Sequence, residues 1–530
     1  MRHTAVMTVG TALSRLTGFL RLTAMTAALG VTVSELGSTY TVANLTPNIV
    51  YELILGGILT SVFVPVFIDR MKTKGWDDAR EVADRVMTLT LAILVAVAAL
   101  GALFAEPIIR LYLVSSDAPD VEAQVELGVF LLRWFMPQIV FYGVGAVASG
   151  LLQANRRFGA PAFAPILNNL VVIATFIAYA LIRGDRPPRV EGITTAEETV
   201  LAVGTTLGVV AMTLALWPSL RSLGYRIRLR FGRRHEAIRH LGRLAAWVAL
   251  YVAANQLAYV VVIILNNRFS AGPQIYATAF TVFQLPYAIF AVSIFTALLP
   301  GMSERWSAGD PAGLRTFVSR GLRDTVVVTI PAALGLSVLA EPIARVLFEH
   351  GQAVPADSVA IAETLQGFAV GLLFFSAFQL LTRTFYAMQD SRTPALVNVA
   401  AAVVNVLAAL AYTGPLDLGL QGMALAHATS YVVGTTGLVV LLRGRIGSID
   451  GRRIARTVLT VTVAGVASAV AALAVTDAWD VEPDASVLLQ AAEVGVAILL
   501  GMLVFLAGAL ILRIGEVDDL RQALLRRFRA

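Results

Sequence analysis

Two arginines lie inside the first apolar segment of the chain, in the stretch SRLTGFLRLTAM. An arginine at the centre of a membrane helix costs roughly 2.5–3.5 kcal/mol on insertion scales, so it faces protein or water rather than lipid. On a straight helix Ser14, Gly18 and Arg21 share one face, and Arg15 lies about a quarter-turn away. Gly18 permits bending or close approach between the arginines. Because paired guanidinium groups bind phosphate or pyrophosphate well, this face is a candidate anion site.

The second apolar segment adds polar and helix-breaking residues. Asn48 and Glu52 are candidate substrate contacts. Pro47 and the pair Gly56-Gly57 favour a broken helix, which membrane proteins tolerate where the break lines a cavity. Glu52 either neutralises one of the two arginines or carries a coupling proton. For the arginines themselves, the structural alternative is snorkelling to the membrane surface or pairing with this acid.

Further polar residues occur in later apolar segments. In the stretch YATAFTVFQLPYAIF, Thr281 and Gln284 are candidate substrate contacts and Pro286 is a candidate flexible point. Arg383 precedes a loop, where we expect it at a gate or beside a lipid headgroup. Buried polar side chains in membrane helices mostly form interhelical hydrogen bonds. His427 is therefore interpreted as a structural residue, with a proton relay as the alternative.

The composition is that of a membrane protein. Of 530 residues, 57% are hydrophobic and 14% are charged, whereas soluble domains carry about 25% charged residues. Apolar runs of about 20 residues, enough to cross the hydrocarbon core, recur along the chain. The absence of cysteine excludes disulfides, thiolate metal sites and cysteine nucleophiles. Arg15 and Arg21 would interrupt the apolar core of a cleavable signal peptide, so the first segment is expected to remain in the protein.

Charge and turn signals divide the chain into fourteen expected membrane spans. We therefore expect an all-α polytopic membrane protein. The expected spans are residues 5–29, 38–67, 85–105, 127–152, 162–182, 199–218, 243–266, 275–300, 323–341, 358–387, 395–413, 420–442, 455–476 and 487–512.

The loops between these spans alternate in charge. By the positive-inside rule this places both termini in the cytoplasm. The arginines of the basic loops would contact anionic lipid headgroups, which explains the net charge of +6 without a nucleic-acid partner. The basic loops are 69–85, 153–160, 219–243, 443–456 and 513–530, and the acidic or mixed loops are 106–126, 183–198, 341–357 and 477–486.

An internal repeat relates the two halves of the chain. FAEPIIRLYL at 104–113 recurs as LAEPIARVLF at 339–348, and VFVPVFIDR at 62–70 recurs as ALLPGMSER at 297–305, both with an offset of 235 residues. An offset of six spans preserves orientation, so two parallel six-helix lobes are expected, with a binding site between them near the membrane midplane.

The repeat also predicts the domain organisation. Twelve helices belong to the two lobes, and the last two form a C-terminal pair. The predicted parts are an N-lobe at 1–218, a basic cytoplasmic linker at 219–242, a C-lobe at 243–442, and helices thirteen and fourteen with a tail at 443–530.

Several kinds of chemistry lack their motifs in this sequence. There is no G-x-x-x-x-G-K-[ST] phosphate loop, no H-E-x-x-H zinc motif and no G-x-S-x-G nucleophile elbow. The segments outside the membrane are too short for an enzyme domain. We expect no cofactor, no metal and no catalytic residues.

Five stretches occur in an order and spacing that resemble a known family. They are SRLTGFLR (14–21), TPNIVYELILGGILTSVFVP (46–65), NRRFGAPAFAPILNN (155–169), LFEHG (347–351) and FYAMQDSRTP (385–394). Together they cover both lobes. The chain resembles MurJ/MviN-type lipid II flippases of the multidrug/oligosaccharidyl-lipid/polysaccharide exporter superfamily.

The resemblance implies a substrate and a mechanism. The substrate would be an undecaprenyl-pyrophosphate-linked disaccharide-peptide of peptidoglycan synthesis. It would move from the inner to the outer leaflet of the bacterial cytoplasmic membrane by alternating access. The family's cavity is cationic, and its first-helix arginines fall on Arg15 and Arg21.

Other family positions differ in this chain. The acid that often follows the second arginine is Leu22, and the arginine pair of the second helix is Tyr51-Glu52. The eighth-helix arginine and the acid beyond it are Thr281 and Gln284. The seventh helix, with AANQLAYVV, lacks the acid of the sodium site described for some members. These differences imply either a divergent pyrophosphate site or a different lipid.

Four other interpretations are compatible with the sequence. In the same class are a flippase for another polyprenyl-linked glycan and a drug/cation antiporter, which would need an acid and aromatic walls in its cavity. A membrane enzyme acting on the same lipid would need a carboxylate at an outer loop–helix junction. A scaffold would recruit cell-wall synthesis proteins through the arginine-rich loop at 219–243. Membrane lipids are expected partners in every case.

Overall fold

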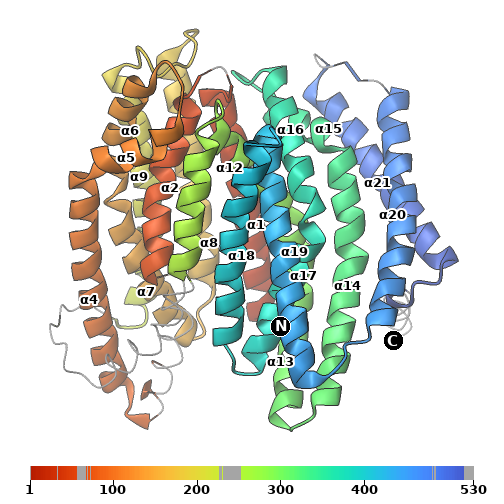
Figure 1. Ribbon diagram of the computed structural model, residues 1–530. Helices are drawn as coiled ribbons and strands as arrows, with labels where there is room; N and C mark the ends of the chain where they lie inside the picture. Colours follow the sequence, from red (N-terminus) through yellow and green to blue (C-terminus); the bar gives the residue numbers. More distant parts are fainter. Residues whose placement is uncertain are drawn as a thin grey trace. The chain divides into compact units, whose positions relative to one another are not determined.

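The computed structural model describes residues 2–32, 34–55, 67, 70–71, 73–225, 230, 252–479, 481–482 and 485–517 (Figure 1). All regular secondary structure in these residues is helical, which confirms the all-α prediction. The helices are α1 (Arg2–Leu29), α2 (Leu36–Leu55), α4 (Trp76–Leu103), α5 (Ala105–Tyr112), α6 (Val121–Phe135), α7 (Gln138–Ala154), α8 (Gly159–Arg183), α9 (Thr195–Leu214), α10 (Trp217–Arg221), Val252–Asn266, α12 (Gly272–Pro286), α13 (Val292–Ser307), α14 (Pro311–Val338), α15 (Ala340–Phe348), α16 (Pro355–Val370), α17 (Leu372–Ala387), α18 (Arg392–Thr413), α19 (Gly419–Ile446), α20 (Gly451–Trp479) and α21 (Val487–Ile511).

Many of these helices are long and apolar enough to cross a membrane. Within the described residues there are 10 such spans, or 11 if α16 and α17, which meet at an angle of 48°, count as one. The predicted count of fourteen is not confirmed. Three predicted spans are occupied by α1, α2 and the shorter apolar helix Val252–Asn266, which are not among these 11.

The internal repeat recurs in the lengths and order of the helices. The helices α4 and α14 both have 28 residues, and each is followed by a short helix, α5 or α15. In both short helices a glutamate pairs with the arginine one turn later, with N–O distances of 3.0 Å in Glu106–Arg110 and 2.9 Å in Glu341–Arg345. The Glu-Pro motifs are therefore structural helix starts, consistent with their repetition.

The chain forms two compact units. The first contains residues 1–274 and 350–354, and the second contains 275–349 and 355–530. The boundary falls after the predicted linker 219–242, most of which lies outside the described residues. The reason is that Ile263 of helix Val252–Asn266 packs into the core of the first unit. The division into repeat-related lobes and a C-terminal pair remains a prediction.

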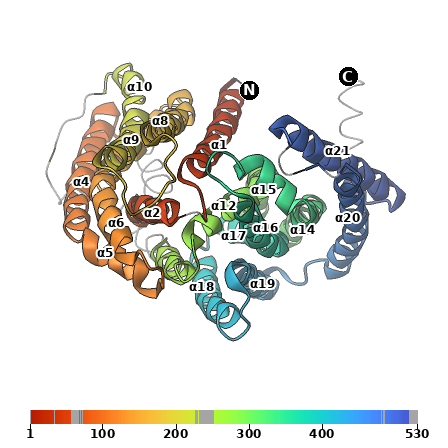
Figure 2. The same ribbon diagram turned by 90° about the horizontal axis from the view of Figure 1, so that it is seen from above.

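In the first unit, α8 packs between α1 and α9 (Figure 2). One apolar core surrounds Tyr40, whose ring contacts Phe135 and Phe176 edge-on. A second core, centred on Phe67 and Leu152, joins α4, α7 and the segment after α9. These contacts fix α1 and α2, the helices that carry the candidate site.

The C-terminal end of α1 is held by groups from other segments. A helix leaves its last carbonyls without intrahelical partners, and three of the last carbonyls in and just after α1 receive donors here. The pairs are Gln352 N to Ala27 O at 2.9 Å, Arg183 Nη1 to Ala28 O at 2.5 Å, and Gln274 Nε2 to Gly30 O at 2.9 Å.

The basic loops meet at one end of the first unit. Arg230 pairs with Glu81 at 3.2 Å, and the guanidinium of Arg80 lies over the ring of Tyr225. Segments from loops 69–85 and 219–243, both predicted to be cytoplasmic, thus lie together. That this end faces the cytoplasm remains a prediction.

The second unit is built around α14 and α19. The helix α14 packs on α17 and α20, whereas α19 packs on α16, α17 and α18. The pair α20–α21 meets α14 through Ile330, Ala464 and Phe505. The last two helices are therefore packed on the second unit.

Candidate functional site

The helix α8 covers the face of α1 that contains Ser14 and Gly18. The side-chain amide of Asn169 donates to Ser14 O at 3.1 Å and to Thr17 Oγ1 at 3.0 Å. A Cβ added at Gly18 would lie 3.4 Å from the same amide nitrogen. Gly18 therefore allows close packing of α1 on α8 within the first unit, and its predicted gating role is not tested.

The two arginines on α1 differ in environment. Arg15 is exposed and Arg21 is half-buried. Arg21 lies within electrostatic range of the hydroxyl groups of Tyr40 on α2 and Tyr142 on α7. Among the described residues neither arginine forms an ion pair, so the pairing with Glu52 considered from the sequence does not occur there. Both guanidinium groups are available for an anion.

The prediction of a break at Pro47 is wrong for the described part of the chain. The helix α2 runs continuously from Leu36 to Leu55 through a buried Pro47. Packing of α2 against α6 and α7 holds the helix in place, and the side chain of Asn48 donates to Asn44 O at 3.0 Å beside the proline. Such local donors are how membrane helices tolerate proline. The predicted gating residues Gly56 and Gly57 lie outside the described residues.

Glu52 opens onto a small pocket inside the first unit. The pocket has a volume of about 250 Å³ and lies between α2, α7, α8 and α9. The rings of Tyr51 and Tyr142 stand 5.2 Å apart, centre to centre, on its wall. Ser149 and Gln153 add polar side chains. Tyr142 thus borders this pocket and also lies within electrostatic range of Arg21.

The remaining predicted residues belong to the second unit. Thr281 is exposed on α12 and its hydroxyl donates to Ala277 O at 2.8 Å. Gln284 is half-buried on the same helix. Pro286 ends α12 and is followed by a π-helical turn, Tyr287–Ala291, an irregularity often found at functional sites. Arg383 is half-buried on α17. The roles of these residues are not tested.

His427 lies inside an aromatic cluster of the second unit. Its ring is within 5.5 Å, centre to centre, of the rings of Phe280, Phe368 and Tyr431. Its Nε2 is buried and has no hydrogen-bond partner in the described structure. The dense ring packing fits the structural role inferred from the sequence.

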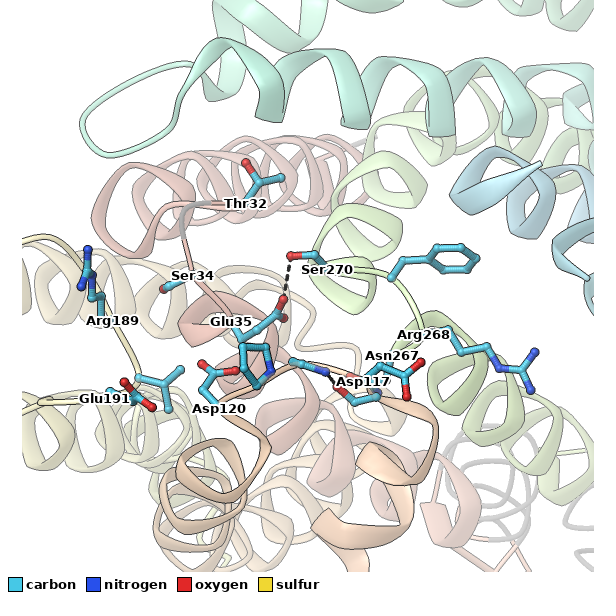
Figure 3. A pocket seen from close by; sticks show the side chains of 15 residues that line it. Thr32, Ser34, Glu35, Asp117, Asp120, Arg189, Glu191, Asn267, Arg268 and Ser270 are labelled. Atoms are coloured by element: carbon cyan, nitrogen blue, oxygen red, sulfur yellow. Dashed lines mark hydrogen bonds between the residues drawn. The ribbon is translucent and has the colours of Figure 1, made fainter. Parts of the chain in front are cut away.

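A larger polar pocket lies at the acidic-loop end of the first unit (Figure 3). Its volume is about 650 Å³, and loops 106–126 and 183–198, both predicted to be outside, contribute to it. Glu35 accepts hydrogen bonds from Ser270 Oγ at 2.8 Å and from the backbone of Ala271 at 2.9 Å. Burial, with the nearby charge of Asp120, raises the pKa of Glu35 above its ordinary range.

This shift predicts a pH-dependent stability. Because the folded state holds the Glu35 proton more tightly than the unfolded state, stability falls as pH rises through and above the ordinary glutamate pKa. Glu35→Gln keeps an acceptor for Ser270 and Ala271 but cannot ionise. We expect its melting temperature to exceed that of the wild type by a few degrees at pH 7.5 and by less at pH 4.5, measured by thermal denaturation in detergent. Parallel pH profiles for the two proteins would contradict this.

The described residues contain no group of three or more histidine or acidic side chains that could hold a metal ion. No cofactor chemistry is derived from the site.

Sequence reasoning missed the residues that position the arginines. Asn169, Tyr40 and Tyr142 come from three different helices and meet α1 or Arg21 only in the folded unit. The asparagine pair in PILNN on α8 was visible as a polar interruption of an apolar helix. Nothing in the sequence tied it to α1.

Comparisons of the sequence and of the fold with known proteins give consistent results. The family model described as "Lipid II flippase MurJ" matches residues 25–482. A relative from Rhizobium meliloti (strain 1021), "Probable lipid II flippase MurJ", is 28% identical over 426 residues, which cover 78% of this chain and 75% of the relative.

Two solved structures share the fold. "Lipid II flippase MurJ, inward closed conformation" aligns with a TM-score of 0.77 at 21% identity, covering 96% of this chain and 99% of that one. An inward-facing multidrug resistance MATE family transporter of the MOP superfamily aligns with a TM-score of 0.68 at 14% identity, covering 83% and 99%.

Proposed function

This chain belongs to the lipid II flippase MurJ family, and we propose that it moves lipid II from the inner to the outer leaflet of the bacterial cytoplasmic membrane by alternating access. One observation of the structure carries the proposal: Arg15 and Arg21 lie on an apolar helix without a described ion-pair partner. Unpaired arginines at membrane depth indicate an anionic ligand in a wet cavity. The pyrophosphate of a lipid-linked precursor is such an anion.

In the proposed mechanism, Arg15 and Arg21 hold the pyrophosphate through charge-assisted hydrogen bonds. Ser14, Asn48, Thr281 and Gln284 contribute polar contacts to the headgroup. The polyprenyl tail stays in the bilayer while the headgroup crosses between the lobes. Membrane potential is a sufficient driver in principle, since one charge moved through 100 mV is worth about 2.3 kcal/mol.

The flexible and gating elements of the proposal lie on both units. Gly18 and Pro47 shape the first two helices, and Pro286 precedes the π-helical turn of the second unit. Arg383 would act at the cytoplasmic gate, as would the two glycines after α2. Both termini would lie in the cytoplasm, and cell-wall synthesis proteins would be partners at the basic linker.

A second candidate within the same superfamily fold is a cation antiporter. The pocket at Glu52 has the acid and aromatic wall that such a protein needs. The two arginines without described acid partners argue against it, because a cation antiporter would not need two arginines on its first helix. A flippase for another polyprenyl-linked glycan would use the same arginines and differ in the headgroup contacts.

Growth complementation tests the proposed function. The gene should sustain growth of a bacterium depleted of its own lipid II flippase, and the depleted cells should otherwise accumulate lipid II and lyse. Membrane abundance of the protein is measured in parallel. If the protein reaches the membrane at wild-type flippase levels and growth still fails while lipid II accumulates, the proposed function is wrong.

A further inference from the structure

Glu52 has no established role, and its surroundings point to a ligand. In the described residues Glu52 has neither an ion pair nor a hydrogen bond. The side chain of Glu52 is exposed on α2, so its carboxylate is open to water or to a ligand.

The pocket beside Glu52 limits the kind of ligand. Its volume of about 250 Å³ is many times the roughly 10–15 Å³ that one water molecule needs. That space is far larger than a bare metal ion. Among the described residues Glu52 is its single acidic lining residue, whereas protein sites for divalent metals bring together several carboxylate or imidazole ligands.

The wall of the pocket suits an organic cation. The rings of Tyr51 and Tyr142 stand beside the carboxylate at 5.2 Å from each other, and aromatic rings attract ammonium groups through their π faces. Ser149 and Gln153 offer acceptors for the remaining N–H groups. Gly145 faces Thr213, and a Cβ there would lie 3.3 Å from the threonine hydroxyl, so α7 and α9 close the inner side.

The pocket lies close to the candidate anion site at Arg21, which relates it to the proposed substrate. Tyr142 lines the pocket and lies within electrostatic range of Arg21. Glu52 and Arg21 thus both lie in the neighbourhood of Tyr142. A headgroup that carries both a pyrophosphate and a peptide amine would match this pair of charges.

We propose that the pocket formed by Glu52, Tyr51, Tyr142, Ser149 and Gln153 binds an organic ammonium group. If the ammonium group belongs to the peptide of the transported lipid, the inference rests on the proposed function. The alternative ligand with the same ammonium chemistry is a free organic amine.

The first arm of the test measures binding of a free amine. Radiolabelled 1,5-diaminopentane is added to the purified full-length protein and binding is followed by scintillation proximity. Two variants probe the pocket: Glu52→Gln removes the charge, and Ser149→Phe fills the space with the charge intact. Glu363→Gln, at an exposed acid on α16, is the matched control. We expect saturable binding that weakens at least tenfold in both pocket variants and stays unchanged in the control.

The second arm measures transport in proteoliposomes. Lipid II with a free side-chain amine in its peptide is compared with the same lipid after acetylation of that amine. We expect the wild type to move the free-amine lipid at least five times faster. Glu52→Gln should lower that rate to the rate of the acetylated lipid and leave the acetylated lipid unaffected.

Together, the two arms distinguish the two sources of the ammonium group, and they test the ammonium site separately from the flippase proposal. Glu52-dependent discrimination between the lipids assigns the pocket to the peptide amine, and Glu52-dependent binding of diaminopentane alone assigns it to a free amine. If neither measurement depends on Glu52 and Ser149, the ammonium site is refuted. If the wild type moves neither lipid, the flippase proposal fails, whereas the binding arm still decides the pocket.

Discussion

Arg21→Ala is expected to reduce lipid II transport by at least about 100-fold. Arg21 is half-buried, lies within electrostatic range of Tyr40 and Tyr142, and has no acid partner among the described residues. A hydrogen bond to a charged group contributes roughly 1.5–3 kcal/mol, so losing a two-pronged contact with pyrophosphate costs about 3 kcal/mol or more. Each 1.4 kcal/mol is a factor of ten. Growth complementation should be lost with it.

Two further variants make this result interpretable. Arg21→Lys keeps the charge but not the planar fork, so it should restore only part of the activity. Arg133→Ala removes an exposed arginine near the end of α6 and should leave transport unchanged. Membrane abundance and melting temperature of all three variants should match the wild type. Normal transport by Arg21→Ala would remove the main argument for the anion site.

Gly351→Ala is expected to cause the largest loss of stability among simple substitutions in the described loops. Gly351 has φ of +66°, and an added Cβ would lie 2.4 Å from Ala27 O. The clash is with the backbone of α1, at the carbonyl that accepts the hydrogen bond from Gln352 N. Neither side can move without breaking that bond. We expect a destabilisation of about 3 kcal/mol, since strained backbone alone costs roughly 1–3 kcal/mol.

A matched glycine separates the clash from the backbone strain. Gly309 also has a positive φ, +68°, but an added Cβ would meet no atom within 4 Å. Gly309→Ala should cost about 1 kcal/mol from the left-handed conformation alone. Thermal denaturation of the two variants in detergent measures the difference. Equal melting temperatures would show that residue 351 does not pack tightly against the backbone of α1.

Local patterns in the sequence predicted much of the fold. The repeat of FAEPIIRLYL as LAEPIARVLF anticipated the matching helices α4–α5 and α14–α15, because the same residues make the same helix starts and the same Glu–Arg pairs. Apolar runs located the long helices. The unit boundary was missed because helix Val252–Asn266 packs on the first unit through Ile263, a contact that periodicity does not reveal.

The candidate site was only partly predictable. The cost of charge in an apolar helix identified Arg15, Arg21 and Glu52 directly. Their surroundings could not be predicted from the sequence. Asn169 on α8 and Tyr142 on α7 are more than a hundred positions away from α1 along the chain and approach it only in the fold. Pro47 was misread as a break, because the helix propensity of a single residue does not include the packing of α2 on α6 and α7.

Leaflet-resolved transport is the most direct test of the central claim. Purified protein is reconstituted into proteoliposomes with fluorescent lipid II in both leaflets, and a membrane-impermeant quencher reports the label that becomes accessible over time. The account predicts lipid II movement by the wild type well above protein-free liposomes, and movement near that background for Arg21→Ala. Movement at the protein-free rate by a folded wild-type protein, with an established flippase active in the same assay, would contradict it.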